Sequence, residues 1–385
     1  MSQDIRDFIA TSCDLLALGE PTHAVPAFGH VRNALLAQLA EHGFRSIALE
    51  TDRVAALAVD DYVREGIGDL DTVLTEGFSH GWGAMEANRE LVTWMREHNR
   101  NRPPQDRLAF HGFDAPTENF SAPSPRPYLE HARDYLGLDL DLAVGAGDDE
   151  RWSRTEAIMD PARSPGASAE ARRLRAIAGD LLAALDAREP AAGSRAAWLR
   201  ARTHLTAGLA LLRYHKQAAV PLDQNERVTR LSATRDAIMA QNLLDLRAIE
   251  AGRGPTLVHA HNSHLQKSTS SMSVPGLELR WIGAGALVAH LLGDRYAFVA
   301  GSLGRSEPIG VTEPDQDTFE GHLQARFTTW GLAPADLPGS ARTRTDTGPQ
   351  RNGYFPLDAA MLDGADAVMH LADSTLVRGG VSHPA

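Results

Sequence analysis

The sequence predicts an α/β protein with a mostly parallel central sheet flanked by helices and an inserted helical-bundle subdomain. Short apolar runs alternate with stretches of helical periodicity over residues 15–114 and again from residue 256 onward. Between them, residues 128–251 carry almost no strand signal and are rich in Ala, Leu and Arg at helical spacing. Alternating strands and helices are typical of a parallel sheet covered on its faces, and a long strand-free stretch is typical of a bundle.

The first part of the chain supplies three strand patterns and three helix patterns. Each predicted strand is a short apolar run, followed within two residues by an acidic or imidazole side chain. Each predicted helix has apolar residues three or four positions apart. The predicted strands span residues 15–18, 46–49 and 108–110, and the predicted helices span residues 27–42, 53–65 and 84–100.

The middle of the chain predicts long helices, and the last part returns to strands. The three long helical patterns span residues 168–188, 195–218 and 224–250, and the later predicted strands span residues 256–258, 296–300 and 367–371. We therefore expect residues 1–127 and 252–385 to form one α/β catalytic core. We expect residues 128–251 to form a helical subdomain that covers the active-site cleft.

Composition excludes several classes of partner. The chain has 385 residues and a formal net charge of -12, without a basic stripe that would bind nucleic acid. Its single cysteine, Cys13, cannot form an internal disulfide or a Cys-rich metal site. No N-terminal signal pattern occurs, and no apolar run reaches the roughly 18 residues that span a bilayer. We expect a cytoplasmic protein with a small-molecule substrate and no nucleic-acid or membrane partner.

Polar side chains follow four of the predicted strands. Ligands of open parallel sheets bind outside the carboxyl ends of the strands, so these side chains are candidates for chemistry. They are Glu20 with His23, Glu50, His111 with Asp114, and His261 with His264.

Arg32 adds a charge to this set. It lies within the apolar stripe that Phe28, Leu35 and Leu39 form along the first predicted helix. A buried guanidinium needs a carboxylate partner, because burying it unpaired is costly. We expect Arg32 to pair with Glu20 or Glu50.

The histidines fit two kinds of site equally well. His23 has the ordinary pKa range of a general base at neutral pH. His259 and His261 would share one side of a strand, and His261 and His264 would share one side of a helical turn. Either spacing is compatible with metal ligation, although the HExxH pattern is absent. A Gly-x-Ser-x-Gly nucleophile motif is also absent, which favours attack by an activated water.

The combined motifs resemble the erythromycin esterase family. Residues 18–50 resemble its Gly-Glu-x-x-His block, and residues 82–99, which include Glu86, resemble a second block. Arg235-Asp236 resembles a third, and His261-Asn262-Ser263-His264 resembles the His-Asn-x-His motif of the family. Residues 355–375 resemble its C-terminal strand region, so the likeness covers nearly the whole chain. His259 stands where the family usually has Trp.

The resemblance implies a carboxylic ester hydrolase that cleaves an ester or macrolactone without a metal or other cofactor. His23 would activate the water, Glu20, Arg32 and Glu50 would orient it, and His261 and His264 would polarise the carbonyl. A macrolide or related natural product would be the substrate, as in antibiotic resistance. The residues expected to bind substrate are His111, Asp114, Asn262, Glu86, His259 and Arg235.

Two other reactions use the same residues. A biosynthetic enzyme of secondary metabolism would use this acid/base set for cyclisation, elimination or acyl transfer. A metal-dependent hydrolase would use Glu20, His23, His261 and His264 as ligands.

Overall fold

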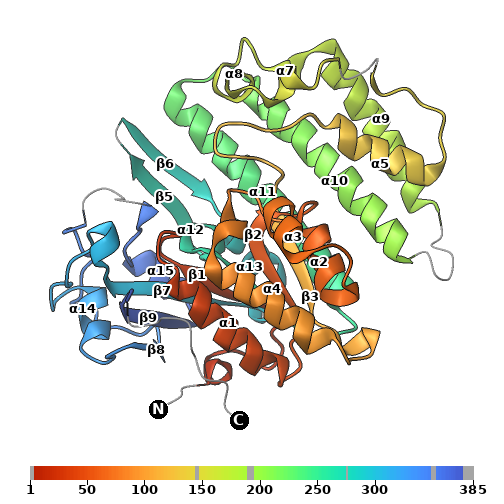
Figure 1. The fold of residues 1–385 in the computed structure, drawn as a ribbon. Helices are drawn as coiled ribbons and strands as arrows, with labels where there is room; N and C mark the ends of the chain where they lie inside the picture. The colour runs from red at the N-terminus through yellow and green to blue at the C-terminus, as the bar shows by residue number, and fades with distance from the viewer. Residues whose placement is uncertain (1–3, 144–146, 189–194, 275, 348–352, 376–385) are drawn as a thin grey trace.

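A computed structural model describes residues 4–143, 147–188, 195–274, 276–347 and 353–375 of the protein (Figure 1). Within these ranges, a central sheet has seven strands in the order β3-β2-β4-β1-β7-β9-β8. The strands are β1 (Leu15–Glu20), β2 (Ser46–Asp52), β3 (Ala109–Asp114), β4 (Thr256–His261), β7 (Tyr296–Arg305), β8 (Trp330–Ala333) and β9 (Ala367–Asp373). All neighbouring pairs are parallel except β8 with β9. The predicted α/β class, with a mostly parallel central sheet flanked by helices, is confirmed.

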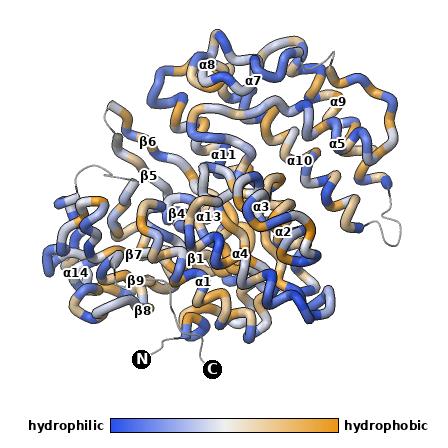
Figure 2. The backbone as a smooth tube through the Cα atoms, viewed as in Figure 1, coloured by the Kyte–Doolittle hydropathy of each residue, from blue (hydrophilic) through white to orange (hydrophobic). Residues whose placement is uncertain are grey.

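Helices cover both faces of this sheet, and each face has its own apolar core. The helices of the first face are α1 (Ala27–Ala40), α2 (Ala56–Glu65) and α4 (Glu86–Asn99), which pack on strand residues such as Leu18 and Ile47. The second face packs against α13 (Ala284–Leu292) and the end of α11 (Gln224–Glu250), with strand residues such as Ala17 and Val258. Figure 2 shows apolar segments concentrated around the sheet and these helices.

The helices of the middle of the chain form a layer of their own (Figure 1). Its main helices are α5 (Arg126–Leu136), α7 (Glu150–Ser153), α8 (Thr155–Met159), α9 (Ala169–Asp186) and α10 (Arg195–Ala218). Apolar side chains of α5, α9 and α10 pack on one another, apart from the cores of the sheet. The expected division between residues 127 and 128 and between 251 and 252 stays a prediction.

Helix α11 belongs to both layers. Leu231 and Ile238 pack against α10, whereas Met239, Leu243 and Leu246 pack on the sheet. Its apolar side therefore changes partner near its middle. The polar residues at that point face the carboxyl ends of the sheet strands.

A separate antiparallel hairpin lies beside the carboxyl ends of the sheet strands. It consists of β5 (Thr269–Val274) and β6 (Leu277–Ile282), paired from Thr269↔Ile282 to Val274↔Leu277. The sequence analysis assigned no strand to it, because β5 is mostly polar. Edge strand β8 was missed for a different reason, since it has only 4 residues. The shorter helices, which were also not assigned, are α3 (Leu70–Glu76), α12 (Asn262–Leu265), α14 (Phe319–Gln324) and α15 (Ala359–Gly364).

Among the described residues, no helix combines the length and the apolar character needed to cross a bilayer.

Candidate active site

The candidate site lies at the carboxyl ends of three neighbouring strands. Glu20 ends β1, Glu50 lies near the end of β2, and His261 ends β4. The parallel register places Glu20 level with His261. The strand order turns back on itself around β1 and β4, which is where open α/β sheets bind ligands.

Glu20 and Glu50 point to opposite faces of the sheet. Side chains alternate along a strand, so Glu20 follows Leu18 toward α1, and Glu50 follows Ala48 toward α11. The β2–β3 register shifts between Leu49 and Asp52, directly at Glu50. A side chain on the turn above the strands can therefore reach both carboxylates.

His23 is that side chain. Its Nδ1 lies 2.6 Å from Oε1 of Glu20, and its Nε2 lies 3.7 Å from Oε2 of Glu50. Its side chain is 34% exposed, against 11% for Glu20 and 4% for Glu50. Because a carboxylate only accepts hydrogen bonds, Nδ1 carries the hydrogen, and Nε2 is left to take a proton.

Electrostatics strengthen His23 as a base. Burial opposes the ionisation of Glu20 and Glu50, but nearby histidines, His259 and His264 first among them, hold the pKa of both carboxyls well below the usual range. Burial would also lower the pKa of His23. The charge of Glu50 and the hydrogen bond to Glu20 outweigh it and raise that pKa above its ordinary 6.5.

Arg235 of α11 supplies the fixed cation of the site. Its Nε lies 2.9 Å from Oδ1 of Asp114, and its Nη2 lies 2.5 Å from Oδ2 of Asp114 and 3.0 Å from Oε1 of Glu50. The bidentate pair with the buried Asp114 orients the guanidinium. Glu50 therefore takes its arginine partner from α11, so the predicted placement of Arg32 at this carboxylate is wrong.

Arg32 has other partners. Its guanidinium donates to Oδ1 of Asn33 and Oδ1 of Asn88, and among the described residues it makes no ion pair. It still borders the same small cavity as Glu20, and its burial lowers its pKa to about 10. The sequence pattern placed Arg32 correctly inside the helix stripe, but side-chain amides satisfy it in place of a carboxylate.

Asp236, beside Arg235 in the chain, orients His264. Nδ1 of His264 lies 2.9 Å from Oδ1 of Asp236. Oδ1 of Asp236 also accepts from the backbone N–H of Ala284, and Oδ2 accepts from the indole N–H of Trp281. Burial would lower the pKa of His264, but the charges of Asp236 and Glu50 raise it. The sequence analysis quoted Asp236 within a motif and gave it no role.

His261 is held by the backbone on both sides of its ring. Its Nε2 donates to the carbonyl of Pro21 at 3.1 Å, and its Nδ1 accepts from the backbone N–H of Ser263. Burial, and then the like charge of His23, lower its pKa to about 4. His261 is therefore neutral and fixes the turn that carries His23.

The other predicted site residues have mixed placements. His259 contacts Glu20, with Nε2 3.3 Å from Oε2. Asn262 is fully buried, and its side chain hydrogen-bonds the backbone of Gly301. Glu86 is exposed at the start of α4.

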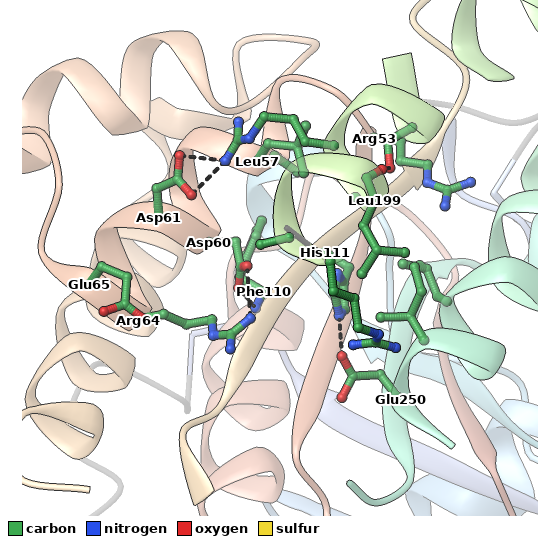
Figure 3. Close-up of a pocket in the computed structure, with 18 of the residues that line it drawn as sticks. Arg53, Leu57, Asp60, Asp61, Arg64, Glu65, Phe110, His111, Leu199 and Glu250 are labelled. Atoms are coloured by element: carbon green, nitrogen blue, oxygen red, sulfur yellow. Dashed lines mark hydrogen bonds and ion pairs between the residues drawn. The ribbon is translucent and has the colours of Figure 1, made fainter. Parts of the chain in front are cut away.

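His111 lies in a different cavity, of about 630 Å³, between α2 and the ends of α10 and α11. Its Nε2 contacts Glu250 at 2.9 Å, and Figure 3 shows its ring pointing toward that carboxylate. His111 is the first polar residue after its strand pattern, whereas Asp114, three positions later, reaches the site. The structure does not bring His111 to the other predicted site residues.

His80 was not predicted and joins the site from the loop before α4. Among the described residues, it is the only one other than glycine with positive φ, at 57°. Its Nδ1 lies 2.7 Å from Glu118 and its Nε2 lies 3.3 Å from Asp114. Strained backbone conformations cluster at functional sites, and nothing in the local sequence could reveal this one.

Two cavities border these residues. A small one of about 40 Å³ is lined by Glu20, His23 and Glu50. A larger one of about 400 Å³ has Arg235 and His264 at its polar end. The rest of its wall is mainly apolar, from the helical layer and the β5–β6 hairpin: Ile158, Met159, Leu231, Met272, Leu279 and Trp281.

In the part of the chain that the structure describes, no three His, Cys, Asp or Glu side chains are arranged to hold one metal ion.

The comparison with protein families agrees with the motif resemblance. The family model described as erythromycin esterase matches residues 39–374 of the chain. No curated protein sequence matches this chain.

Solved structures share the fold at low sequence identity. A protein described as a succinoglycan biosynthesis protein has a TM-score of 0.65 and 16% identity, with 96% of this chain and 90% of that chain covered. A Bacillus cereus protein has a TM-score of 0.65 and 16% identity, with 97% and 92% covered. A histidine-to-asparagine mutant of erythromycin esterase EreC, in its open conformation, has a TM-score of 0.65 and 17% identity, with 97% and 93% covered.

Proposed function

The chain belongs to the erythromycin esterase family, and we propose that it hydrolyses an ester or lactone with a water activated by His23 and without a metal ion. The observation that carries this proposal is the position of His23 between Glu20 and Glu50. One ring nitrogen is held by a carboxylate, and the other is open for a proton.

The attacking water has a place beside this base. The cavity of about 40 Å³ bordered by Glu20, His23 and Glu50 is large enough for one water molecule. A water that donates to Nε2 of His23 also lies within reach of Oε2 of Glu50. Two acceptors on one water orient its lone pair and raise its nucleophilicity.

In the proposed reaction, the water attacks the carbonyl carbon while Nε2 of His23 takes its proton. Collapse of the tetrahedral intermediate breaks the bond to the leaving oxygen, and His23 returns the proton to that oxygen. The products are a carboxylic acid and an alcohol, or a hydroxy acid from a lactone. Glu20 stabilises the imidazolium that forms between the two steps.

We propose that Arg235 and His264 donate hydrogen bonds to the oxyanion. Both border the larger cavity, and both contact Oε1 of Glu50, Arg235 at 3.0 Å and His264 at 3.3 Å. Asp114 and Asp236 hold these two donors in place before the charge develops. His261, predicted for this role, positions the turn of His23 instead.

The contacts of the two carboxylates support the proposed metal independence. Glu20 contacts His23 and His259, and Glu50 contacts Arg235 and His264. A metal ion would have to displace these arginine and histidine partners.

The larger cavity suits a small molecule with an apolar body. Its volume of about 400 Å³ falls within the range of roughly 300–1,000 Å³ for ligand pockets. A macrolide or related natural product, with its ester carbonyl at Arg235 and its apolar ring against the β5–β6 hairpin, is the substrate class that we propose.

A panel of macrolides, other macrolactones and simple aryl esters, scored by product mass, tests the function. We expect a gain of one water on at least one lactone or ester, at a rate that EDTA leaves unchanged. Products without a gain of water would point to cyclisation, elimination or acyl transfer. Loss of activity in EDTA, restored by added metal, would contradict the metal-independent reaction.

A further inference from the structure

His259 is an imidazole in an otherwise apolar layer of the sheet. Its neighbours in register are Leu18 on β1 and Leu49 on β2, and Leu257 precedes it on the same side of β4. The side chain is 6% exposed. A buried imidazole costs free energy unless both ring nitrogens find partners.

Both partners of His259 are hydrogen-bond acceptors. Nδ1 lies 2.9 Å from the carbonyl oxygen of Leu18, and Nε2 lies 3.3 Å from Oε2 of Glu20. A backbone carbonyl cannot donate, and neither can an ionised carboxylate. Only an imidazole with hydrogens on both nitrogens, and therefore a positive charge, satisfies both contacts.

Glu20 is consequently shared by two rings. Its Oε1 faces His23, and its Oε2 faces His259. Burial opposes the ionisation of Glu20, and the charge of His259 is the strongest influence in the other direction.

This sharing answers a difficulty in the proposed reaction. A histidine between two carboxylates is held protonated, and a protonated imidazole cannot accept a proton from water. Glu50 is balanced by Arg235 and His264. Among the described residues, His259 is the only cationic group other than His23 within 4.0 Å of Glu20.

The charged or titratable groups that face His259 come from all the elements around it. They are Glu20 on β1, His23 on the following turn, Arg32 on α1, Glu50 on β2 and His261 on β4.

We propose that His259 is a positioning residue, a second imidazolium that shares the Glu20 carboxylate with His23 and so keeps His23 able to accept a proton at neutral pH. The inference rests on the proposed role of His23 as the base. It differs from the substrate-binding role expected from the sequence, because His259 lies behind Glu20 and does not border the larger cavity.

The wild-type protein gives the first test. In protein labelled with ¹⁵N-histidine, two-bond ¹H–¹⁵N correlation spectra distinguish the imidazolium from both neutral tautomers. The signals of His259 are assigned by their absence in His259→Gln. We expect two protonated nitrogens on His259 at pH 7, and a neutral tautomer at that pH would overturn the proposal.

Two variants give the second test. His259→Gln keeps a donor toward Glu20 without the charge, and His259→Leu matches the surrounding apolar layer. Diethyl pyrocarbonate modifies neutral imidazoles, so the pH dependence of His23 modification, followed by peptide mass spectrometry, reports the protonation of His23. We expect the midpoint to rise by about one pH unit in both variants.

Two further proteins calibrate this readout. Glu20→Gln removes the carboxylate and should move the midpoint of His23 down, opposite to the His259 variants. His42→Gln, at an exposed position just after the end of α1, should leave the His23 midpoint unchanged. An unmoved midpoint in either folded His259 variant, with the Glu20→Gln shift present, would overturn the proposal. Modification of His23 does not require turnover. Absence of ester hydrolysis would therefore contradict the proposed function, whereas the role of His259 would still be decided by the modification midpoints.

Discussion

At Glu50, a single buried carboxylate contacts three cationic or imidazole side chains. Arg235 lies 3.0 Å and His264 3.3 Å from Oε1, and His23 lies 3.7 Å from Oε2. The same oxygen of Glu50 that faces His23 also accepts the backbone N–H of His261 at 2.9 Å. The carboxylate is thereby fixed in direction, and its remaining interaction is with the base.

This arrangement predicts the pH dependence of hydrolysis. The neutral form of His23 is active, and its pKa is raised above 6.5, so kcat/KM should fall on the acid side with a midpoint above pH 6.5. Glu20→Gln removes one of the groups that raise this pKa, so its acid limb should move to lower pH. Initial rates from pH 5 to 9 measure both profiles. An acid limb that stays in place in Glu20→Gln would contradict the assignment of His23 as the base.

At the residue scale, the sequence indicates which residue types meet but not which pairs form. Glu20, His23, Glu50 and His264 were predicted from strand-end positions, and the structure brings them together. Arg235 came only from the family motif, because its place on α11 depends on how two layers pack. The partner of Arg32 could not be predicted, since the oxygen of an Asn side chain can accept hydrogen bonds from a guanidinium, as a carboxylate can, but without neutralising its charge.

At the element scale, Asn262 clamps two strands across a third. Its side-chain amide donates to the carbonyl of Gly301 at 2.8 Å and accepts the N–H of Gly301 at 2.9 Å. β1 lies between β4 and β7, so the amide passes over β1 at Gly19. A Cβ at Gly19 would lie 2.0 Å from Oδ1 of Asn262, so only glycine leaves room for the clamp.

Loss of this clamp should destabilise the sheet. Asn262→Ala leaves two buried backbone groups of Gly301 unpaired and should lower the free energy of unfolding by about 2–5 kcal/mol. Gly19→Ala should also destabilise the protein, because the new Cβ clashes with Asn262. The double variant should lose less free energy of unfolding than the sum of the two single losses. Urea unfolding measures all three, with Asn101→Ala at an exposed position as the control. Additive costs would mean that Asn262 and Gly19 do not depend on each other.

The success of the element predictions follows the strength of the local pattern. The buried parallel strands each contain a short apolar run and were predicted, although β7 extends to Arg305 and β1 to Glu20. α10 and α11 have the predicted bounds. β5 is polar and is stabilised by pairing with β6, and periodicity alone does not detect such a strand.

At the scale of the whole molecule, α11 couples the helical layer to the catalytic edge. Its first half packs in the helical layer and its second half on the sheet, with Arg235 and Asp236 between them. Asp236 also accepts the indole N–H of Trp281 on the β5–β6 hairpin at 2.8 Å. The helical layer, the hairpin and the sheet therefore meet at the polar end of the larger cavity.

The free energy of unfolding should depend on pH through one buried acid, Glu320. Its Oε1 accepts from the backbone of Leu357 at 2.8 Å, while its Oε2 has no partner among the described residues. Burial raises its pKa from 4.5 to about 7. The folded protein therefore holds this proton more tightly than the unfolded chain does, and stability is lost as pH rises from about 4.5 to 7.

The variant Glu320→Gln cannot ionise, so it should gain stability relative to the wild type as pH rises. The difference in the free energy of unfolding should change by about 3 kcal/mol in favour of the variant between pH 4.5 and 8. Urea unfolding at several pH values measures this difference. For the control Glu156→Gln, at an exposed position, the difference from the wild type should not change with pH. A flat difference for Glu320→Gln would show that its carboxyl is ionised without penalty.

The hydrolysis rate of His23→Gln tests the central claim most directly. It is measured as kcat/KM against the wild type in EDTA, on the best substrate of the panel, with thermal unfolding as a check of the fold. We predict a fall of about 10²–10⁴-fold, the usual contribution of a general base, and no change in His290→Gln at an exposed position. A folded His23→Gln protein with a rate within a few fold of the wild type would contradict the account.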